Sequence, residues 1–184
     1  MNENDLRVQR TRSLLRQALI DLVKSQGYES ISIRDITKKA QVGYKTFYRH
    51  YEGKEALLQA LVDEKIGEFQ RVLAPPSDPA ASHKNTMAGL IYMETNAELF
   101  LMILNSSAAD QLLNAIIELA LEEGRLTFKS NLIPDELMAH HFAASIISLI
   151  RWWLETGMEI SKETMVEYID QLLFRPMKNL SLPI

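Results

Sequence analysis

Residues 31–51, ISIRDITKKAQVGYKTFYRHY, constrain the fold more than any other stretch, because they predict two short helices joined by a tight turn. Ser32 can cap the first helix, and Asp35 follows at the spacing of a capping-box partner. Residues 41–43 (QVG) then interrupt the pattern, and the second helix surrounds Phe47 with polar side chains. A helix so short, with so many outward donors, is poorly suited to support a core. It is well suited to enter the major groove of DNA.

Residues 11–58 resemble the amino-terminal domain of the TetR/AcrR family of transcriptional regulators. The matching motifs follow the family order: an apolar helix, GYE at 27–29, the helix at 32–40, Val42, TFYRHY at 46–51 and KEALL at 54–58. Two positions depart from the family pattern. Gln41 stands where glycine is usual, and Gly43 where a small hydroxyl residue is usual. A left-handed Gln41 would carry about 1 kcal/mol of strain and could slightly change the angle between the two helices.

The charges are unevenly divided along the chain, whose formal net charge is −4. Residues 1–55 hold eleven Lys or Arg against seven Asp or Glu, whereas residues 56–184 hold nine against seventeen. Together with the helix-turn-helix pattern, a basic first part indicates a protein that presents one end to a polyanion. We therefore predict a helix-turn-helix DNA-binding domain at 1–55 and a helical effector-binding and dimerisation domain at 56–184.

Nine polar residues of the first part are candidate DNA contacts. Tyr44, Lys45 and Thr46 begin the second helix, where side chains reach base edges most easily. Arg34, in the first turn of the preceding helix, is a further base-reading candidate in line with the family pattern. The alternative for each residue is a solvated side chain or, for Tyr48, a core aromatic. Arg49 could face either DNA or solvent. The remaining candidates are expected to hold phosphates: Ser32, Tyr48, His50 and Lys54.

The remainder is helical by pattern, without an alternating strand signal, and predicts an all-α fold. Apolar spacing and breakers place helices at 6–26, 54–73, 83–95, 97–104, 107–129, 135–155 and 161–174, besides the two of the helix-turn-helix. This gives about nine helices, the number that the resemblance implies. The proline-rich segment 74–79 is predicted to be a loop.

The helix predicted at 135–155 is apolar nearly all round and needs cover on several sides. A two-fold dimer, in which this helix and the last one pack against their mates, is an economical way to cover it. TetR-like proteins dimerise in this manner, whereas the alternative is a fully internal helix pair in a monomer. The predicted interface residues are Ala144, Ile147, Ile150, Leu154, Ile169, Leu172 and Leu173.

The resemblance also implies an inducer site inside the second domain. Few charged residues fall on inward positions, which favours an apolar or weakly polar small molecule. Aromatic and Met residues at helical spacing are more often core than ligand contacts. The candidate ligand contacts are Tyr92, Phe100, Met102, Ile103, Phe128, Phe142 and Trp153.

Metal and catalytic sites are not predicted, and no cofactor is expected. The chain has no cysteine, and its adjacent His140 and His141 would point about 100° apart on a helix, too far to bind one ion together. No nucleophile elbow or phosphate-binding glycine loop occurs, so we do not expect an enzyme. No run approaches eighteen apolar residues and no secretory signal is present, so we expect no membrane span and a cytoplasmic location.

These observations predict a homodimeric, sequence-specific transcriptional repressor that binds near-palindromic double-stranded DNA and is released by a small-molecule effector. Two alternatives remain open. One is the same kind of regulator without an effector. The other is an all-helical metabolite- or lipid-binding protein that retains the DNA-binding fold only as a scaffold.

Overall fold

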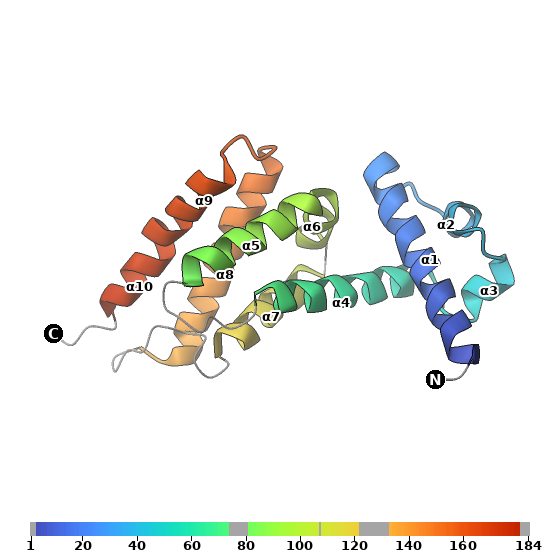
Figure 1. Ribbon diagram of the computed structural model, residues 1–184, viewed down its shortest axis with the longest axis horizontal. Coiled ribbons are helices and arrows are strands. Elements are labelled where there is room, and N and C mark those ends of the chain that lie inside the picture. Colours follow the sequence, from blue (N-terminus) through green and yellow to red (C-terminus); the bar gives the residue numbers. More distant parts are fainter. Residues whose placement is uncertain (1–2, 74–80, 107, 122–132, 181–184) are drawn as a thin grey trace. The chain divides into compact units, whose positions relative to one another are not determined.

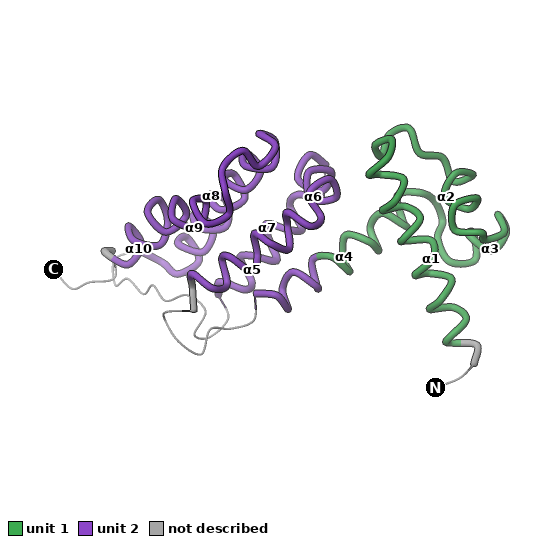
Figure 2. The backbone as a smooth tube through the Cα atoms, turned by 45° about the horizontal axis from the view of Figure 1, so that its top comes forward, with its two compact units in different colours: residues 1–65 green, residues 66–184 purple. Residues whose placement is uncertain are grey.

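The computed structural model describes residues 3–73, 81–106, 108–121 and 133–180, and all regular secondary structure in these ranges is helical (Figure 1). Backbone contacts divide the chain into two compact units, Met1–Lys65 and Ile66–Ile184, here called the head and the body (Figure 2). The division falls inside one helix, α4 (Lys54–Val72). The predicted all-α fold is confirmed, whereas the functional boundary at residue 55 stays a prediction.

The head contains α1 (Glu3–Gln26), α2 (Ile33–Ala40), α3 (Tyr44–Tyr48) and the first turns of α4. Phe47 is the one buried residue of α3, so its ring anchors that helix. All four helices contribute apolar side chains without exposed surface to the head: Leu15, Leu19, Ile36, Phe47, Leu57, Leu61 and Val62.

The beginning of α2 forms as its residues predict. The Asp35 N–H donates to Ser32 Oγ at 3.2 Å, and the Ser32 N–H donates to Asp35 Oδ2 at 3.0 Å. These two bonds are the two halves of a capping box, which satisfies backbone donors that the first helical turn leaves free. The predicted cap is confirmed.

The end of α2 has the left-handed residue that the turn requires. Gln41 has φ 54° and ψ 39°. Its N–H donates to Lys38 O at 3.3 Å, while the Val42 N–H donates to Thr37 O at 3.0 Å. This pair of bonds is a Schellman motif, whose left-handed position glycine usually occupies. Gln41 therefore adopts the strained conformation that the sequence comparison with the TetR/AcrR pattern suggests.

The body contains α5 (Ala81–Thr95), α6 (Ala97–Leu104), α7 (Ala109–Leu121), α8 (Asp135–Glu155), α9 (Lys162–Ile169), a π-helical turn (Asp170–Phe174) and α10 (Arg175–Leu180). The last three are continuous, so the described residues form nine helices if these are counted as one. The predicted helix 107–129 is described only as α7. Its remainder, with Phe128, and the proline-rich segment 74–79 lie outside the described residues.

The last helix does not end at Phe174, where the prediction placed its end. Pro176 lacks an N–H and crowds the preceding turn, which is the reason that a stop is expected there. The π turn, closed by a bond from the Arg175 N–H to Asp170 O, widens the helix directly before this proline. The wider turn also suits the packing, because four-residue steps drift by about 40° each on a regular α-helix. Such steps separate the buried residues Met165, Ile169, Leu173 and Met177.

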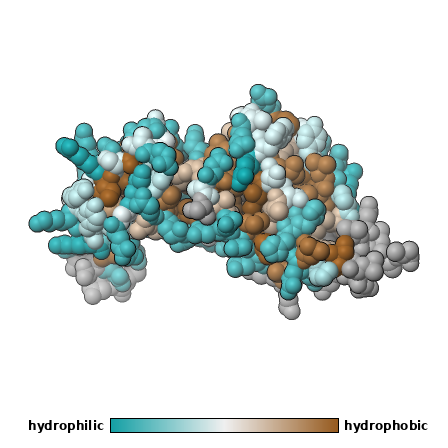
Figure 3. All heavy atoms as spheres, turned by 180° about the vertical axis from the view of Figure 1, so that it is seen from behind, coloured by the Kyte–Doolittle hydropathy of each residue, from teal (hydrophilic) through white to brown (hydrophobic). Residues whose placement is uncertain are grey.

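The two units differ in surface character. On the face shown in Figure 3, apolar side chains gather over the body, while the head is mostly hydrophilic. Among the described residues no single helix is both long and apolar enough to cross a bilayer. The α5–α6 pair satisfies that condition of length and composition only across a 94° bend.

Replacing Gln41 by glycine tests the strain in the turn. We expect Gln41→Gly to raise the free energy of unfolding by up to about 1 kcal/mol, because glycine adopts a positive φ without a side-chain clash. Urea titration followed by circular dichroism measures the change. Lys38→Gly, inside α2, is the matched control and should lower the same quantity by about 1 kcal/mol. Equal losses in the two variants would contradict strain at Gln41.

Candidate nucleic-acid interface

The exposed side of α3 carries two tyrosines and a lysine. Tyr44 and Tyr48 are 54% and 48% exposed, and their ring centroids lie 5.2 Å apart in an edge-to-face arrangement. Their hydroxyl oxygens are 3.5 Å apart, and the hydrogen bond with Tyr44 raises the pKa of Tyr48. The Tyr48 hydroxyl therefore stays protonated and can donate to a phosphate or a base. Lys45 is also exposed, while the buried Phe47 fixes the opposite side of the helix.

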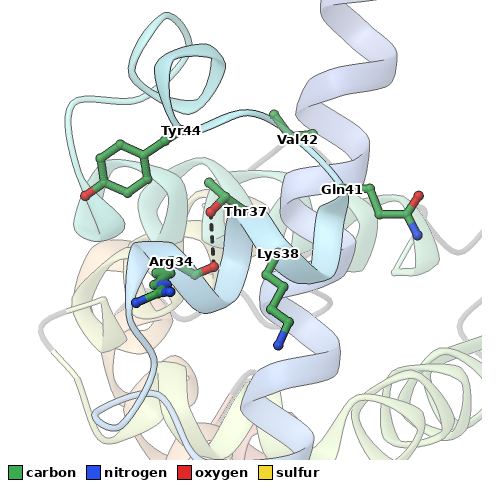
Figure 4. A pocket seen from close by; sticks show the side chains of 6 residues that line it. All are labelled: Arg34, Thr37, Lys38, Gln41, Val42 and Tyr44. Carbon is green, nitrogen blue, oxygen red and sulfur yellow. Dashed lines mark hydrogen bonds between the residues drawn. The ribbon is translucent and has the colours of Figure 1, made fainter.

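A shallow hollow lies between α2 and the beginning of α3 (Figure 4). Arg34, Lys38 and Gln41 follow one another at the spacing of a single helix side. They line the hollow together with Thr37, Val42 and Tyr44. Two cationic side chains beside α3 give this hollow the charge that a phosphate-bearing partner requires. The sequence candidates omit Lys38 and Gln41, although their spacing from Arg34 is a signal that could have identified them.

Two predicted phosphate contacts are engaged inside the head. Ser32 Oγ lies 2.5 Å from Asp35 Oδ2, and the hydrogen bonds from Ser32 hold the pKa of Asp35 below its usual value. Lys54 Nζ donates to Tyr28 O at 3.2 Å and lies 4.2 Å from the centroid of the Tyr28 ring. Both side chains therefore have a structural role besides any contact with DNA.

His50 lies near the end of α3, within the electrostatic reach of two arginines. Burial, and then the charges of Arg12 and Arg49, lower its pKa below the usual 6.5. Arg49 and Arg12 are exposed, whereas His50 and Thr46 are half-buried. Cationic groups that repel one another in the free protein favour a polyanion as partner. Arg12 comes from α1, and no local sequence signal indicates that its charge acts on His50.

Three of the predicted ligand contacts lie in the core of the body. Phe100, Ile103 and Trp153 are at most 1% exposed. The Trp153 indole donates to Ile160 O at 2.8 Å, so its polar edge is satisfied within the body. Met102 is half-buried.

Two aromatic pairs account for the other described ligand candidates. Tyr92 and Phe100 have ring centroids 5.7 Å apart, and the Tyr92 hydroxyl donates to Glu68 Oε2 at 2.6 Å. Phe142 instead lies against Phe174, with ring centroids 5.4 Å apart. Among the described residues, no three His, Asp or Glu side chains are placed to hold a metal ion.

Comparison with known proteins covers both units. The family "Bacterial regulatory proteins, tetR family" matches residues 15–61, and "Transcriptional regulator C-terminal region" matches residues 82–175. The HTH-type transcriptional regulator YxbF of Bacillus subtilis (strain 168) is 29% identical over 175 residues, which are 92% of this chain and 46% of YxbF. DhaS of Lactococcus lactis subsp. lactis (strain IL1403), named the dhaKLM operon transcriptional activator, is 27% identical over 86 residues, which are 47% of this chain and 44% of DhaS. The chain spans about half the length of these curated relatives.

A solved structure shares the fold. The TetR transcriptional regulator from Streptococcus agalactiae 2603V superimposes with a TM-score of 0.72 at 22% identity, over 92% of this chain and 97% of that one. At this identity the likeness establishes the fold alone. It confirms an amino-terminal helix-turn-helix domain followed by a helical domain.

A phosphate contact at His50 would make DNA binding depend on pH with a definite sign. The free imidazole has a pKa below 6.5, and a nearby phosphate would raise it by stabilising the charged form. Binding then takes up protons, so affinity rises as the pH falls from the pKa of the complex to that of the free head, by at most about tenfold per pH unit. Folding has the opposite sign, because the unfolded chain binds the proton more readily and the head loses stability below about pH 6.5.

Fluorescence anisotropy from about pH 8 to about pH 5.5 measures this dependence on labelled duplex DNA. We expect His50→Gln to flatten the slope of affinity against pH, while His83→Gln, which replaces an exposed histidine of α5, leaves it unchanged. Equal slopes for wild type and His50→Gln would contradict the contact.

Proposed function

Because the chain belongs to the TetR family of bacterial transcriptional regulators, we propose that it is a homodimeric repressor of a near-palindromic operator in double-stranded DNA. The family and the relatives are transcription regulators rather than enzymes. One observation carries the proposal: α3 turns Tyr44, Lys45 and Tyr48 outward around a fully buried Phe47, beside a hollow that holds Arg34. Because the buried Phe47 fixes one face of α3, the opposite face must contact solvent or a partner.

The proposed DNA contacts divide into residues that read base edges and residues that bind phosphates and so position the protein. Lys45 can donate to guanine O6 or N7, and the Thr46 methyl can touch a thymine methyl, so both belong with Tyr44 and Arg34 at base edges. Lys54 and His50, with Ser32, Tyr48 and Arg49, are assigned to phosphates, which set register and orientation but carry no sequence information. We propose that the protein acts in the cytoplasm, where the DNA of a bacterium lies.

Selection from random duplexes tests sequence-specific binding. We expect one enriched near-palindrome, with half-sites about 34–36 Å apart from centre to centre. Lys45→Ala should relax the preference at one position of each half-site. Lys54→Ala should weaken all sequences alike and reduce the slope of log affinity against log salt by about one. Enrichment of no site at low salt would refute the proposal.

The direction of regulation is a separate step. DhaS is named an activator, which favours activation as a second candidate function. Both candidates use the same DNA contacts and differ in what bound protein does to transcription. A reporter gene behind the selected site distinguishes them, since a repressor lowers expression and an activator raises it.

The dimer is proposed to form through the open side of α8 and the last helix. Five of the seven predicted interface residues, however, are buried inside their own body: Ile147, Ile150, Leu154, Ile169 and Leu173. Burial within one body argues against contact of the three α8 residues with a partner, whereas Leu173 also lines a hollow between α8 and the last helix. Ala144 and Leu172 are exposed and remain in the proposed interface.

The open side still offers apolar surface. Trp152, Tyr168 and Leu172 are 49%, 43% and 59% exposed. Leu172 and Ala144 line one hollow together with Ser148, so the two helices present a joint surface. The small side chains of Ala144 and Ser148 let a second backbone approach closely, and burial of the large ones would supply the driving force.

A charge at Leu172 tests this interface. We expect Leu172→Glu to convert a dimer into a monomer in sedimentation velocity while the helical content in circular dichroism stays that of the wild type, because the side chain is mostly exposed within one body. Leu14→Glu is the matched control, since Leu14 is 43% exposed but belongs to the head. A Leu172→Glu protein that remains dimeric would exclude this surface.

The effector proposal is supported by the family and by the aromatic side chains of the body. An apolar or weakly polar molecule would act by binding one arrangement of the dimer better than the other, and its differential affinity sets how far the operator is released. The alternative regulator without an effector keeps the same DNA chemistry. The scaffold alternative, a metabolite- or lipid-binding protein, has no support from the relatives, which are named transcriptional regulators.

A further inference from the structure

We propose that Tyr28 is a positioning residue for DNA binding, which holds the Lys54 ammonium group in place at the beginning of α4 for contact with a phosphate. This inference rests on the proposed function and adds to it a residue of the α1–α2 loop that acts through Lys54.

Two contacts from one residue fix the ammonium. Lys54 Nζ donates to Tyr28 O at 3.2 Å and stands 4.2 Å from the centroid of the Tyr28 ring, within the range of a cation–π contact. The Tyr28 carbonyl is itself held, because it accepts from the Ile31 N–H at 3.1 Å. An ammonium has three donors, so the bond to this carbonyl leaves two for a phosphate.

Fixing the lysine matters because its side chain is long and flexible. A free lysine loses most of its rotamer freedom when a phosphate holds it, and this loss opposes binding. Lys54 is already half-buried against Tyr28, whereas Lys45 is exposed. DNA binding must therefore restrict the side chain of Lys45 more than that of Lys54.

The ring and the carbonyl of Tyr28 hold the Lys54 ammonium group, whereas the Tyr28 hydroxyl has no part in this contact. Among the described residues the Tyr28 hydroxyl is buried without a hydrogen-bond partner. Burial, with the nearby charges of Glu55 and Glu29, raises the pKa of Tyr28 to about 12, so it is neutral beside the lysine. Phenylalanine should consequently replace Tyr28 without loss, whereas leucine removes the π face and keeps an apolar side chain.

A double-mutant cycle on the selected duplex tests the proposal. We expect Tyr28→Leu to raise the Kd roughly three- to fivefold and Tyr28→Phe to leave it unchanged. In a Lys54→Ala background Tyr28→Leu should have no further effect, because the group that it positions is gone. In a Lys45→Ala background, the matched control, it should still cost roughly the same three- to fivefold.

The outcomes separate this inference from the proposed function. Wild-type protein that selects no DNA site refutes both, whereas specific binding with an undiminished effect of Tyr28→Leu in Lys54→Ala refutes only the role of Tyr28. A second measurement does not depend on that variant folding. Side-chain NMR relaxation of the wild type should show the Lys54 Cε–Nζ group more restricted than that of Lys45, and equal mobility would overturn the proposal.

Discussion

The burial of Phe47 is the interaction on which the proposed DNA interface depends. Five residues are too few for a helix that is stable by itself, because the nucleation cost exceeds what its few hydrogen bonds return. Tertiary packing must supply the difference, and α3 buries one side chain. The edge-to-face contact of Tyr48 with the Phe47 ring, at 5.4 Å, carries this order to the polar surface. The positions of the side chains proposed to read DNA therefore depend on the packing of Phe47.

Local features of the fold could be predicted, because neighbouring residues determine them. The capping box of Ser32 and Asp35, the left-handed Gln41 and most helix bounds follow from side-chain chemistry within a few positions. The same holds for the exposure of Tyr44 and Lys45, since Phe47 is the apolar residue of a short polar helix. At this level the sequence pattern and the structure agree closely.

Features that need contacts between distant residues could not be predicted. Apolar spacing marks α8 as mostly buried but does not tell which side meets its own body, and Ile147 and Ile150, which are predicted at the dimer interface, are buried within one body. The contact between Lys54 and Tyr28 joins residues 26 positions apart, and the influence of Arg12 on His50 joins two helices. The sequence predicts that Lys54 and His50 hold phosphates, and their partners within the head affect how freely these two side chains can do so.

The π turn at Asp170–Phe174 restricts how this region of the chain can change during evolution. A π turn is an α-helix with one residue inserted, so loss of a residue here would restore regular geometry and rotate all that follows by about 100°. Met177 would leave the core, and Leu172 or its neighbour would take a different place on the surface. A deletion in this helix would therefore have to be accompanied by new apolar positions beyond it, which ties the length of the carboxy-terminal segment to the surface proposed for the dimer.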